Sequence, residues 1–170
     1  MSAKLILREW RLSDKVSLAE NADNINIWNC VRDYFPHPYT VKDGEEFISM
    51  VVNRGDPPVD FAIEIEGVAV GGIGIVLKPD VERIAAEIGY WIGEKYWNRG
   101  VMTEAVREMA RYSFRTFQIE KLYAGVFDFN IASQRVLEKA GFEKEAILKR
   151  AAIKNGNVID LHHYGLIKGL

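Results

Sequence analysis

Residues 87–105 read EIGYWIGEKYWNRGVMTEA, and the pattern of apolar residues changes within this stretch. Residues 85–93 alternate polar and apolar side chains, which is typical of a strand with one buried face. From Met102 to Phe117 the apolar residues recur at helical spacing, with charged residues mostly on the other side. The stretch therefore predicts a strand, a short loop that contains Arg99 and Gly100, and an amphipathic helix.

The predicted loop has the properties of an anion site. The first turn of a helix presents N–H groups without intrahelical partners at the positive end of the helix dipole. Gly100 lets a ligand approach the backbone closely, and Arg99 adds a positive charge. Residues 98–103 are therefore suited to hold a phosphate or a diphosphate. The alternative is that Gly100 only begins a helix and that Arg99 is a surface residue.

Further strands and helices are expected on both sides of this stretch. The predicted strands are 5–10, 61–65, 68–77, 85–93, 121–127, 143–153 and 158–167, with tight turns at Glu66-Gly67 and Asn155-Gly156. The predicted helices are 14–23 with Ser13 as N-cap, 42–53, and 131–140 closed by Gly141. Residues 25–40 are rich in aromatics and prolines and are expected to be irregular with short helical turns.

This order predicts an α+β fold with a single mixed, mostly antiparallel central sheet flanked by helices, in one domain over residues 1–170. Apolar positions assign the inward faces of the first two helices. For the helix 14–23 they are Val16, Ala19 and Ala22, and for the helix 42–53 they are Phe47, Met50 and Val51.

The composition excludes several classes of protein. The 170 residues are 48% hydrophobic and 27% charged with a net charge of −2, which is ordinary for a globular domain. The sequence has no cluster of Lys and Arg of the kind that indicates a nucleic-acid partner. The N-terminus lacks the pattern of a signal peptide, and no apolar run is long enough to cross a membrane. The single cysteine, Cys30, excludes an internal disulfide and suits a reducing compartment, so a cytoplasmic location is expected.

Two segments resemble the motifs of the GNAT N-acetyltransferase superfamily. Residues 87–105 are similar to its cofactor-binding motif, and residues 130–142 (NIASQRVLEKAGF) are similar to the motif that follows. Together with the opening residues 5–8 (LILR), they most resemble the ribosomal-protein N-terminal acetyltransferase branch. The resemblance implies the acyl-CoA N-acyltransferase fold and acetyl-CoA as the acetyl donor, without a metal.

The resemblance also implies which residues bind the donor. The diphosphate of coenzyme A is expected on the backbone amides of Asn98, Arg99, Gly100, Val101, Met102 and Thr103. The strand edge of Trp91, Ile92 and Gly93 is expected to pair with the pantetheine arm, and the Ile92 N–H would then polarise the thioester carbonyl. Asn130 matches the asparagine of the family that bonds the pantetheine.

Two residues are candidates for the proton transfers of a direct reaction in a ternary complex. Glu87, which acts through water, is the candidate base. Ser133 lies in the first turn of its helix, where the dipole favours negative charge, and the resemblance to the N-terminal acetyltransferase branch implies that it is the acid for the leaving thiolate. The alternatives are an ion-paired strand carboxylate for Glu87 and a capping role for Ser133. Many superfamily members place a tyrosine acid where this chain has Leu137, and Cys30 is not required as a nucleophile.

The acceptor is expected to be a primary amine, either a protein N-terminus or a small amine. The aromatic residues Trp28, Tyr34, Phe35 and Tyr39 either line the acceptor groove or pack in the core, and Asp160, His162 and His163 on the last strand are expected to be structural. Two other functions stay open at this point: a catalytically silent acyl-CoA-binding regulator, and a structural adaptor. The resemblance leaves the oligomeric state open, although homodimers are common in this branch.

Overall fold

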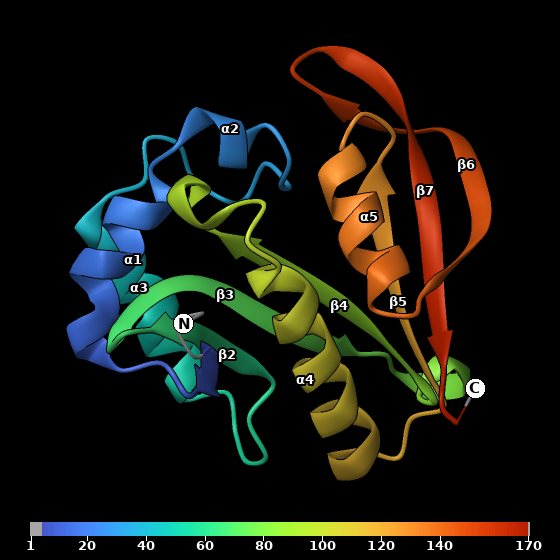
Figure 1. Ribbon diagram of the computed structural model, residues 1–170, viewed down its shortest axis with the longest axis horizontal. Helices are drawn as coiled ribbons and strands as arrows, with labels where there is room; N and C mark the ends of the chain where they lie inside the picture. Colours follow the sequence, from blue (N-terminus) through green and yellow to red (C-terminus); the bar gives the residue numbers. More distant parts are fainter. Residues whose placement is uncertain (1–4, 170) are drawn as a thin grey trace. The chain divides into compact units, whose positions relative to one another are not determined.

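The structure is a computed structural model that describes residues 5–169 (Figure 1). Its strands form one sheet in the order β1-β2-β3-β4-β5-β7-β6. The strands are β1 (Leu5–Arg8), β2 (Asp60–Ile65), β3 (Val68–Leu77), β4 (Ala85–Ile92), β5 (Lys121–Phe127), β6 (Glu143–Lys154) and β7 (Asn157–Ile167). The α-helices are α1 (Lys15–Ala22), α2 (Ile25–Trp28), α3 (Val41–Val52), α4 (Val101–Thr116) and α5 (Ile131–Lys139).

The strand pairings confirm the predicted α+β class. β4 pairs with β5 in parallel, whereas the β1–β2, β2–β3, β5–β7 and β6–β7 pairs are antiparallel. The sheet is therefore mixed and mostly antiparallel, as predicted. No helix within residues 5–169 is both long and apolar enough to cross a membrane.

The described chain divides into two compact units. The first comprises residues 5–74 and 90–105, and the second comprises residues 75–89 and 106–169. The boundaries fall inside β3, β4 and α4, so each of these elements contributes residues to both units. The single domain expected over residues 1–170 stays a prediction.

In the first unit, α1 and α3 lie side by side (Figure 1), and their buried residues share a core with β2 and β3. Gly44 permits this close approach, because a Cβ there would lie 3.0 Å from the Lys15 carbonyl oxygen of α1. Leu18 and Ile48 are almost completely buried in this core. The β2–β3 turn has positive φ at Glu66 (51°) and Gly67 (81°), which confirms the predicted tight turn.

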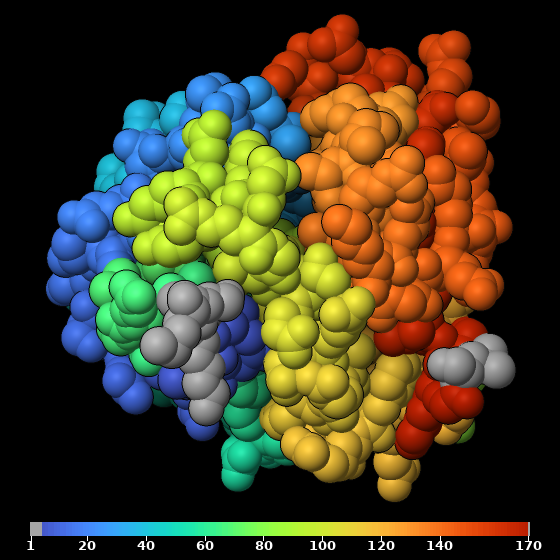
Figure 2. All heavy atoms as spheres, in the orientation of Figure 1, coloured from blue at the N-terminus to red at the C-terminus, as the bar shows by residue number. Residues whose placement is uncertain are grey.

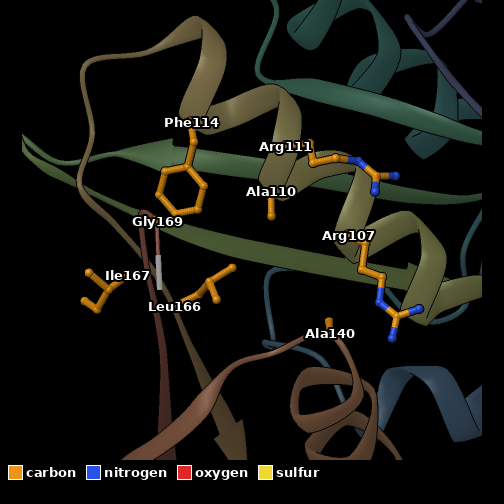
Figure 3. A pocket seen from close by; sticks show the side chains of 8 residues that line it. All are labelled: Arg107, Ala110, Arg111, Phe114, Ala140, Leu166, Ile167 and Gly169. Atoms are coloured by element: carbon orange, nitrogen blue, oxygen red, sulfur yellow. The ribbon is translucent and has the colours of Figure 1, made fainter.

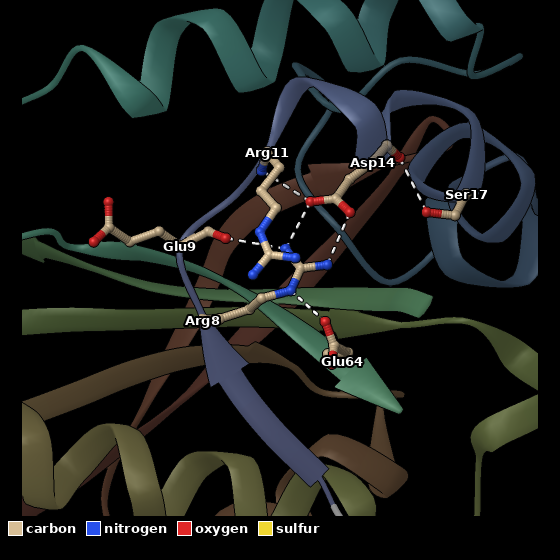
Figure 4. Close-up of polar contacts among 6 residues, drawn as sticks. All are labelled: Arg8, Glu9, Arg11, Asp14, Ser17 and Glu64. Carbon is tan, nitrogen blue, oxygen red and sulfur yellow. Dashed lines mark hydrogen bonds and ion pairs between the residues drawn. The ribbon is translucent and has the colours of Figure 1, made fainter. Parts of the chain in front are cut away.

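A partly buried ion network fixes the start of the first unit (Figure 4). The guanidinium of Arg8 donates to both carboxylate oxygens of Asp14 at 2.7 and 2.8 Å, and also to Glu64. Burial raises the pKa of Asp14, but the hydrogen bonds from Arg8 and from the Arg11 backbone outweigh it and leave this pKa below its ordinary value. The network ties β1 and β2 to the chain that enters α1.

The structure corrects three predictions about the first two helices. Ser13 is not an N-cap, because a 3-10 turn, η1 (Leu12–Asp14), precedes α1 and places Asp14 at the cap position. Val16 and Met50 are about half exposed (49 and 52%) and do not face the core. Ala19 and Ala22 are buried as predicted, and Phe47 and Val51 pack against the core. Leu18 and Ile48 also lie in the core, because the faces of α1 and α3 that meet are rotated toward these residues and away from Val16 and Met50.

In the second unit, β4, β5, β7 and β6 are neighbours in the sheet, and α5 packs on β7. The hydroxyl of Tyr164, a fully buried β7 residue, donates to Glu138 of α5 at 3.1 Å. The β6–β7 turn has positive φ at Asn155 (50°) and Gly156 (76°), as predicted from its Asn-Gly sequence. α5 ends one residue earlier than expected, and Gly141 follows it with a φ of 98°, which suits a helix C-terminus.

Candidate active site

The segment of residues 97–103, here called the α4 loop, follows β4 after a short turn and includes the first residues of α4. Asn98 and Gly100 have positive φ angles of 58° and 77°. The Glu104 N–H donates to the Gly100 carbonyl at 3.2 Å, which is the opening bond of the helix. The N–H groups of Val101, Met102 and Thr103 therefore precede the helical ladder, as expected at a helix N-terminus.

Space and charge around the α4 loop suit an anion. A Cβ on Gly100 would meet no atom within 4 Å, so the outer side of the turn is open. The cations of Arg99 and Lys95 lie 5.8 and 5.2 Å from the ring centre of Tyr96. In Figure 2 this yellow-green part of the chain lies on the visible surface, in agreement with the exposure of residues 97–100. The loop therefore combines backbone donors, open space and two nearby positive charges.

Hydrogen bonds at the end of β4 show which backbone N–H groups there point toward β3 and which point away from it. The Gly93 N–H donates to the Val70 carbonyl of β3 at 2.8 Å. Because successive peptide groups of a strand point to opposite edges, the peptide groups of Ile92 face away from β3. The Trp97 indole N–H donates to the Ile92 carbonyl at 2.9 Å. Of the three strand residues expected to pair with pantetheine, Ile92 thus directs its N–H away from β3, whereas the Gly93 N–H is used by β3.

The segment between α1 and α3 contacts this end of β4 within the first unit. Trp91 packs edge-on against Phe35, with ring centres 5.6 Å apart. Gly93 must lack a side chain, because a Cβ there would collide with the buried side chain of Asn21. Glu94, the next residue, accepts hydrogen bonds from Asn24 and Asn26.

Glu87 lies in the second unit on β4, opposite Tyr123 of β5 in the parallel register. Its carboxylate is 3.1 Å from the ammonium of Lys78. Hydrogen bonding to Tyr123 and the neighbouring Glu87 raise the pKa of Lys78, so this lysine stays charged. The ion pair anticipated as one alternative for Glu87 is present, and the pair is about one quarter exposed.

Two glycines leave room beside Glu87. Gly89 follows it on the same face of β4, and Gly125 follows Tyr123 on the same face of β5, because side chains alternate along a strand. A Cβ at either glycine would meet no atom within 4 Å. The sheet therefore carries a carboxylate next to two positions with open space above the backbone.

Further polar residues continue this face toward β6. The ring of His163 stacks on Tyr123 at 4.9 Å, and its Nδ1 lies 3.4 Å from a carboxylate oxygen of Glu145. Lys121, which donates to Glu145 at 2.6 Å, holds the pKa of that carboxyl below its ordinary value. His162 points to the other side, where its Nδ1 lies 3.2 Å from Gln134 of α5. The two histidines thus occupy opposite faces, as predicted.

Asn130 and Ser133 meet at the start of α5. Asn130 is the N-cap, and its side-chain oxygen accepts the Ser133 backbone N–H at 3.2 Å. The backbone of Ser133, rather than its hydroxyl, therefore takes part in this cap. Leu137 is fully buried, and its hydrocarbon side chain has no proton to donate.

An open surface pocket of about 350 Å³ lies elsewhere in the second unit (Figure 3). Arg107, Arg111 and Phe114 of α4 line it, and Leu166 near the end of β7 lies across from α4. None of its lining residues was predicted to bind the donor or to act in catalysis.

Sequence reasoning missed several residues of these sites. These include Lys78, Tyr123 and Glu94. No local sequence motif indicates which residues contact them. The alternation of β4 placed Glu87 and Gly89 on one face, and this signal could have revealed the space beside Glu87.

Comparison with known proteins identifies the family. Residues 4–143 match the family model described as "Acetyltransferase (GNAT) domain". "Probable N-acetyltransferase YjcK" of Bacillus subtilis (strain 168) is 44% identical over 71 residues, which are 42% of this chain and 39% of that relative. The chain thus spans well under two thirds of the length of that relative.

Two further comparisons cover more of the chain. The ribosomal protein uS5-alanine N-acetyltransferase of Escherichia coli (strain K12) is 30% identical over 156 residues, 86% of this chain and 76% of that protein. The structure of Mycobacterium smegmatis RimJ in complex with CoA-disulfide has a TM-score of 0.85 at 23% identity, and covers 96% of this chain and 82% of that one. The likeness to this structure supports the fold, and the family model decides the family: the chain belongs to the GNAT acetyltransferases.

Proposed function

We propose that this protein transfers the acetyl group of acetyl-CoA to a primary amine. The observation that carries the proposal is the α4 loop, with its two positive φ angles, its open Gly100 and the N–H groups ahead of the α4 ladder. These features fit a diphosphate, which needs several donors and no side chain in the way. Membership of the GNAT family supports acetyl-CoA as the molecule that carries it.

In this proposal the donor is held by main-chain groups. The amides of Asn98 to Thr103 bind the diphosphate, and Arg99 adds a positive charge at the exposed side. The Ile92 N–H, which faces away from β3, donates to the thioester carbonyl and stabilises the negative charge that develops there. The Asn130 side-chain oxygen is used by the α5 cap, so its NH₂ group is the part that donates to the pantetheine arm.

The reaction proceeds by direct attack within a ternary complex. The amine nitrogen attacks the thioester carbonyl carbon, a C–N bond forms, and the C–S bond then breaks to release the thiolate of coenzyme A. Glu87 takes the proton that the amine loses, through a water molecule, and Ser133 donates a proton to the thiolate. Exchange with solvent then removes the proton from Glu87 and restores the hydroxyl of Ser133. The space at Gly89 and Gly125 beside Glu87 supports this role for the carboxylate.

The proposed acceptor is an α-amine, such as a protein N-terminus, with a small amine as the second choice. An α-amine has a pKa near 8 and is partly neutral at neutral pH, whereas a lysine amine with a pKa near 10.4 needs more assistance. The named activity of the Escherichia coli relative toward alanine of a ribosomal protein supports an N-terminal acceptor. The single, partly buried Cys30 supports a reducing, cytoplasmic setting. A homodimer stays a prediction.

A measurement of coenzyme A release with acetyl-CoA and a panel of N-terminal peptides and small amines tests the proposal. We expect turnover with at least one amine, and a thermal stabilisation by about 2.7 kcal/mol at a coenzyme A concentration 100 times its dissociation constant. Tight binding without turnover on any amine would instead favour the catalytically silent acyl-CoA-binding regulator. Absence of binding would contradict both functions.

A further inference from the structure

Residues 24–39, here called the 24–39 loop, form a closed loop in the first unit. The loop starts at Asn24 and ends where the Tyr39 N–H donates to the Asp23 carboxylate at 2.9 Å. Within it, the rings of Trp28 and His37 lie 5.9 Å apart. This bond holds the two ends of the loop together.

The 24–39 loop is attached to the end of β4 at two points that flank Ile92. Phe35 packs on Trp91 on one side of Ile92. On the other side, the two carboxylate oxygens of Glu94 each accept a hydrogen bond, from Asn24 Nδ2 at 2.6 Å and from Asn26 Nδ2 at 3.0 Å. An acyl group held at the Ile92 N–H would therefore have this loop beside it.

Glu94 also begins the turn that leads into the α4 loop. It is the first residue of the 3-10 turn η3 (Glu94–Tyr96), and its carbonyl accepts the Trp97 N–H at 3.0 Å. The side chain of Glu94 thus holds the 24–39 loop, while its backbone supports the first residue of the α4 loop. One residue connects the segment next to the expected acyl group with the loop expected to bind the diphosphate.

We propose that Glu94 is a positioning residue that holds the 24–39 loop in place for the amine acceptor, through its paired hydrogen bonds to Asn24 and Asn26. This inference rests on the proposed function, because it takes the acyl group to lie at Ile92. It assigns the 24–39 loop to acceptor binding and assigns to Glu94 no contact with either substrate.

The geometry of the pair permits an exchange of hydrogen-bonding roles. The Asn24 side-chain oxygen caps α2 by accepting the Asn26 N–H at 2.8 Å, so only its NH₂ group can face Glu94. In Glu94→Gln, the single amide oxygen can accept from only one of the two Asn NH₂ groups, so one of the two bonds is lost. In Asn24→Asp, the cap is kept but two carboxylates face each other. In the double variant, the amide introduced on η3 donates to the carboxylate introduced at the α2 cap and accepts from Asn26, so both bonds return.

The experiment measures kcat, the KM for an amine that the wild-type protein acetylates, and the dissociation constant of coenzyme A for the two single variants and the double variant. We expect each single variant to raise the acceptor KM about three- to tenfold, because each loses one charged hydrogen bond at an exposed site. We expect kcat and coenzyme A binding to change less than about twofold. The double variant should return the acceptor KM to within about twofold of the wild-type value. The control Glu46→Gln removes an exposed ion pair with Lys42 on α3 and should change nothing.

Hydrogen exchange of residues 24–39 provides a readout that does not depend on turnover. We expect faster exchange in both single variants and wild-type protection in the double variant. The role of Glu94 would be overturned if the single variants kept the wild-type acceptor KM and hydrogen exchange. It would also be overturned if the double variant raised the acceptor KM by the combined effect of the two single variants. Wild-type protein that acetylates no amine would instead contradict the proposed function, and the exchange data would still decide whether Glu94 holds the loop.

Discussion

The α4 loop and the sheet face around Glu87 are built in different ways, although both are assigned to one reaction. The α4 loop offers backbone N–H groups whose directions follow from two positive φ angles and a helix start within seven residues. The Glu87 face consists of side chains from β4, β5, β7 and β6 together with Lys78, the residue after β3, and its charges are engaged in ion pairs. A main-chain site is therefore encoded locally, whereas a side-chain site depends on the whole sheet.

The largest effect is expected at the Glu87 face. Glu87→Gln should lower kcat by about 10² to 10³, the usual contribution of a general base, and leave the dissociation constant of coenzyme A within about twofold. Glu145→Gln is the matched control, because Glu145 is also paired with a lysine on this face. Steady-state kinetics and calorimetry check both variants. If Glu87→Gln keeps more than about a third of kcat, Glu87 is not the base.

The next effect distinguishes the α4 loop from an ordinary tight turn. Gly100 (φ 77°) and Gly156 (φ 76°) have nearly the same conformation and equally open surroundings. Gly100→Ala and Gly156→Ala should therefore lose similar stability, about 1 kcal/mol each. Only Gly100→Ala should weaken coenzyme A binding, by about 30-fold, because its methyl group occupies the space expected for the diphosphate. Equal affinities in calorimetry would contradict a diphosphate at this loop.

Ser133→Ala should lower kcat about tenfold through loss of the hydroxyl that protonates the thiolate. The melting temperature should change little, because alanine keeps the backbone N–H that Asn130 accepts. Ser133→Thr retains a hydroxyl and should recover most of kcat. A Ser133→Ala variant that loses stability and keeps its rate would indicate a structural role for the hydroxyl.

The smallest effect is expected for the exposed charge of the α4 loop. Arg99→Ala should raise the dissociation constant of coenzyme A about three- to fivefold at low salt, with less difference at high salt, because exposed charges are screened. Arg83→Ala is the control, because Arg83 is exposed and donates to the nearby Asp80 carbonyl. Titrations at two salt concentrations check the expectation. An effect of Arg99→Ala that does not depend on salt would argue against a charge interaction.

Local sequence signals predicted much of the fold. The bounds of β5, the two turns with positive φ and the strand–loop–helix order of residues 85–116 follow from spacing and turn chemistry, and the structure confirms them. The exposure of Val16 and Met50 could not be predicted, because it depends on which faces of α1 and α3 meet. The partners of Glu94 lie about 70 residues away in sequence, so no pattern near Glu94 indicates them. For the side-chain part of the site, the sequence therefore predicted which residues take part, but it did not predict the residues that contact them.

A crystal structure of the protein with acetyl-CoA is the most direct test of the central claim, that backbone N–H groups at the start of α4 hold the diphosphate. We predict diphosphate oxygens within hydrogen-bond distance of the N–H groups of residues 98–103 and the thioester carbonyl at the Ile92 N–H. A diphosphate bound at another place, or an empty loop in crystals grown with saturating acetyl-CoA, would contradict the account.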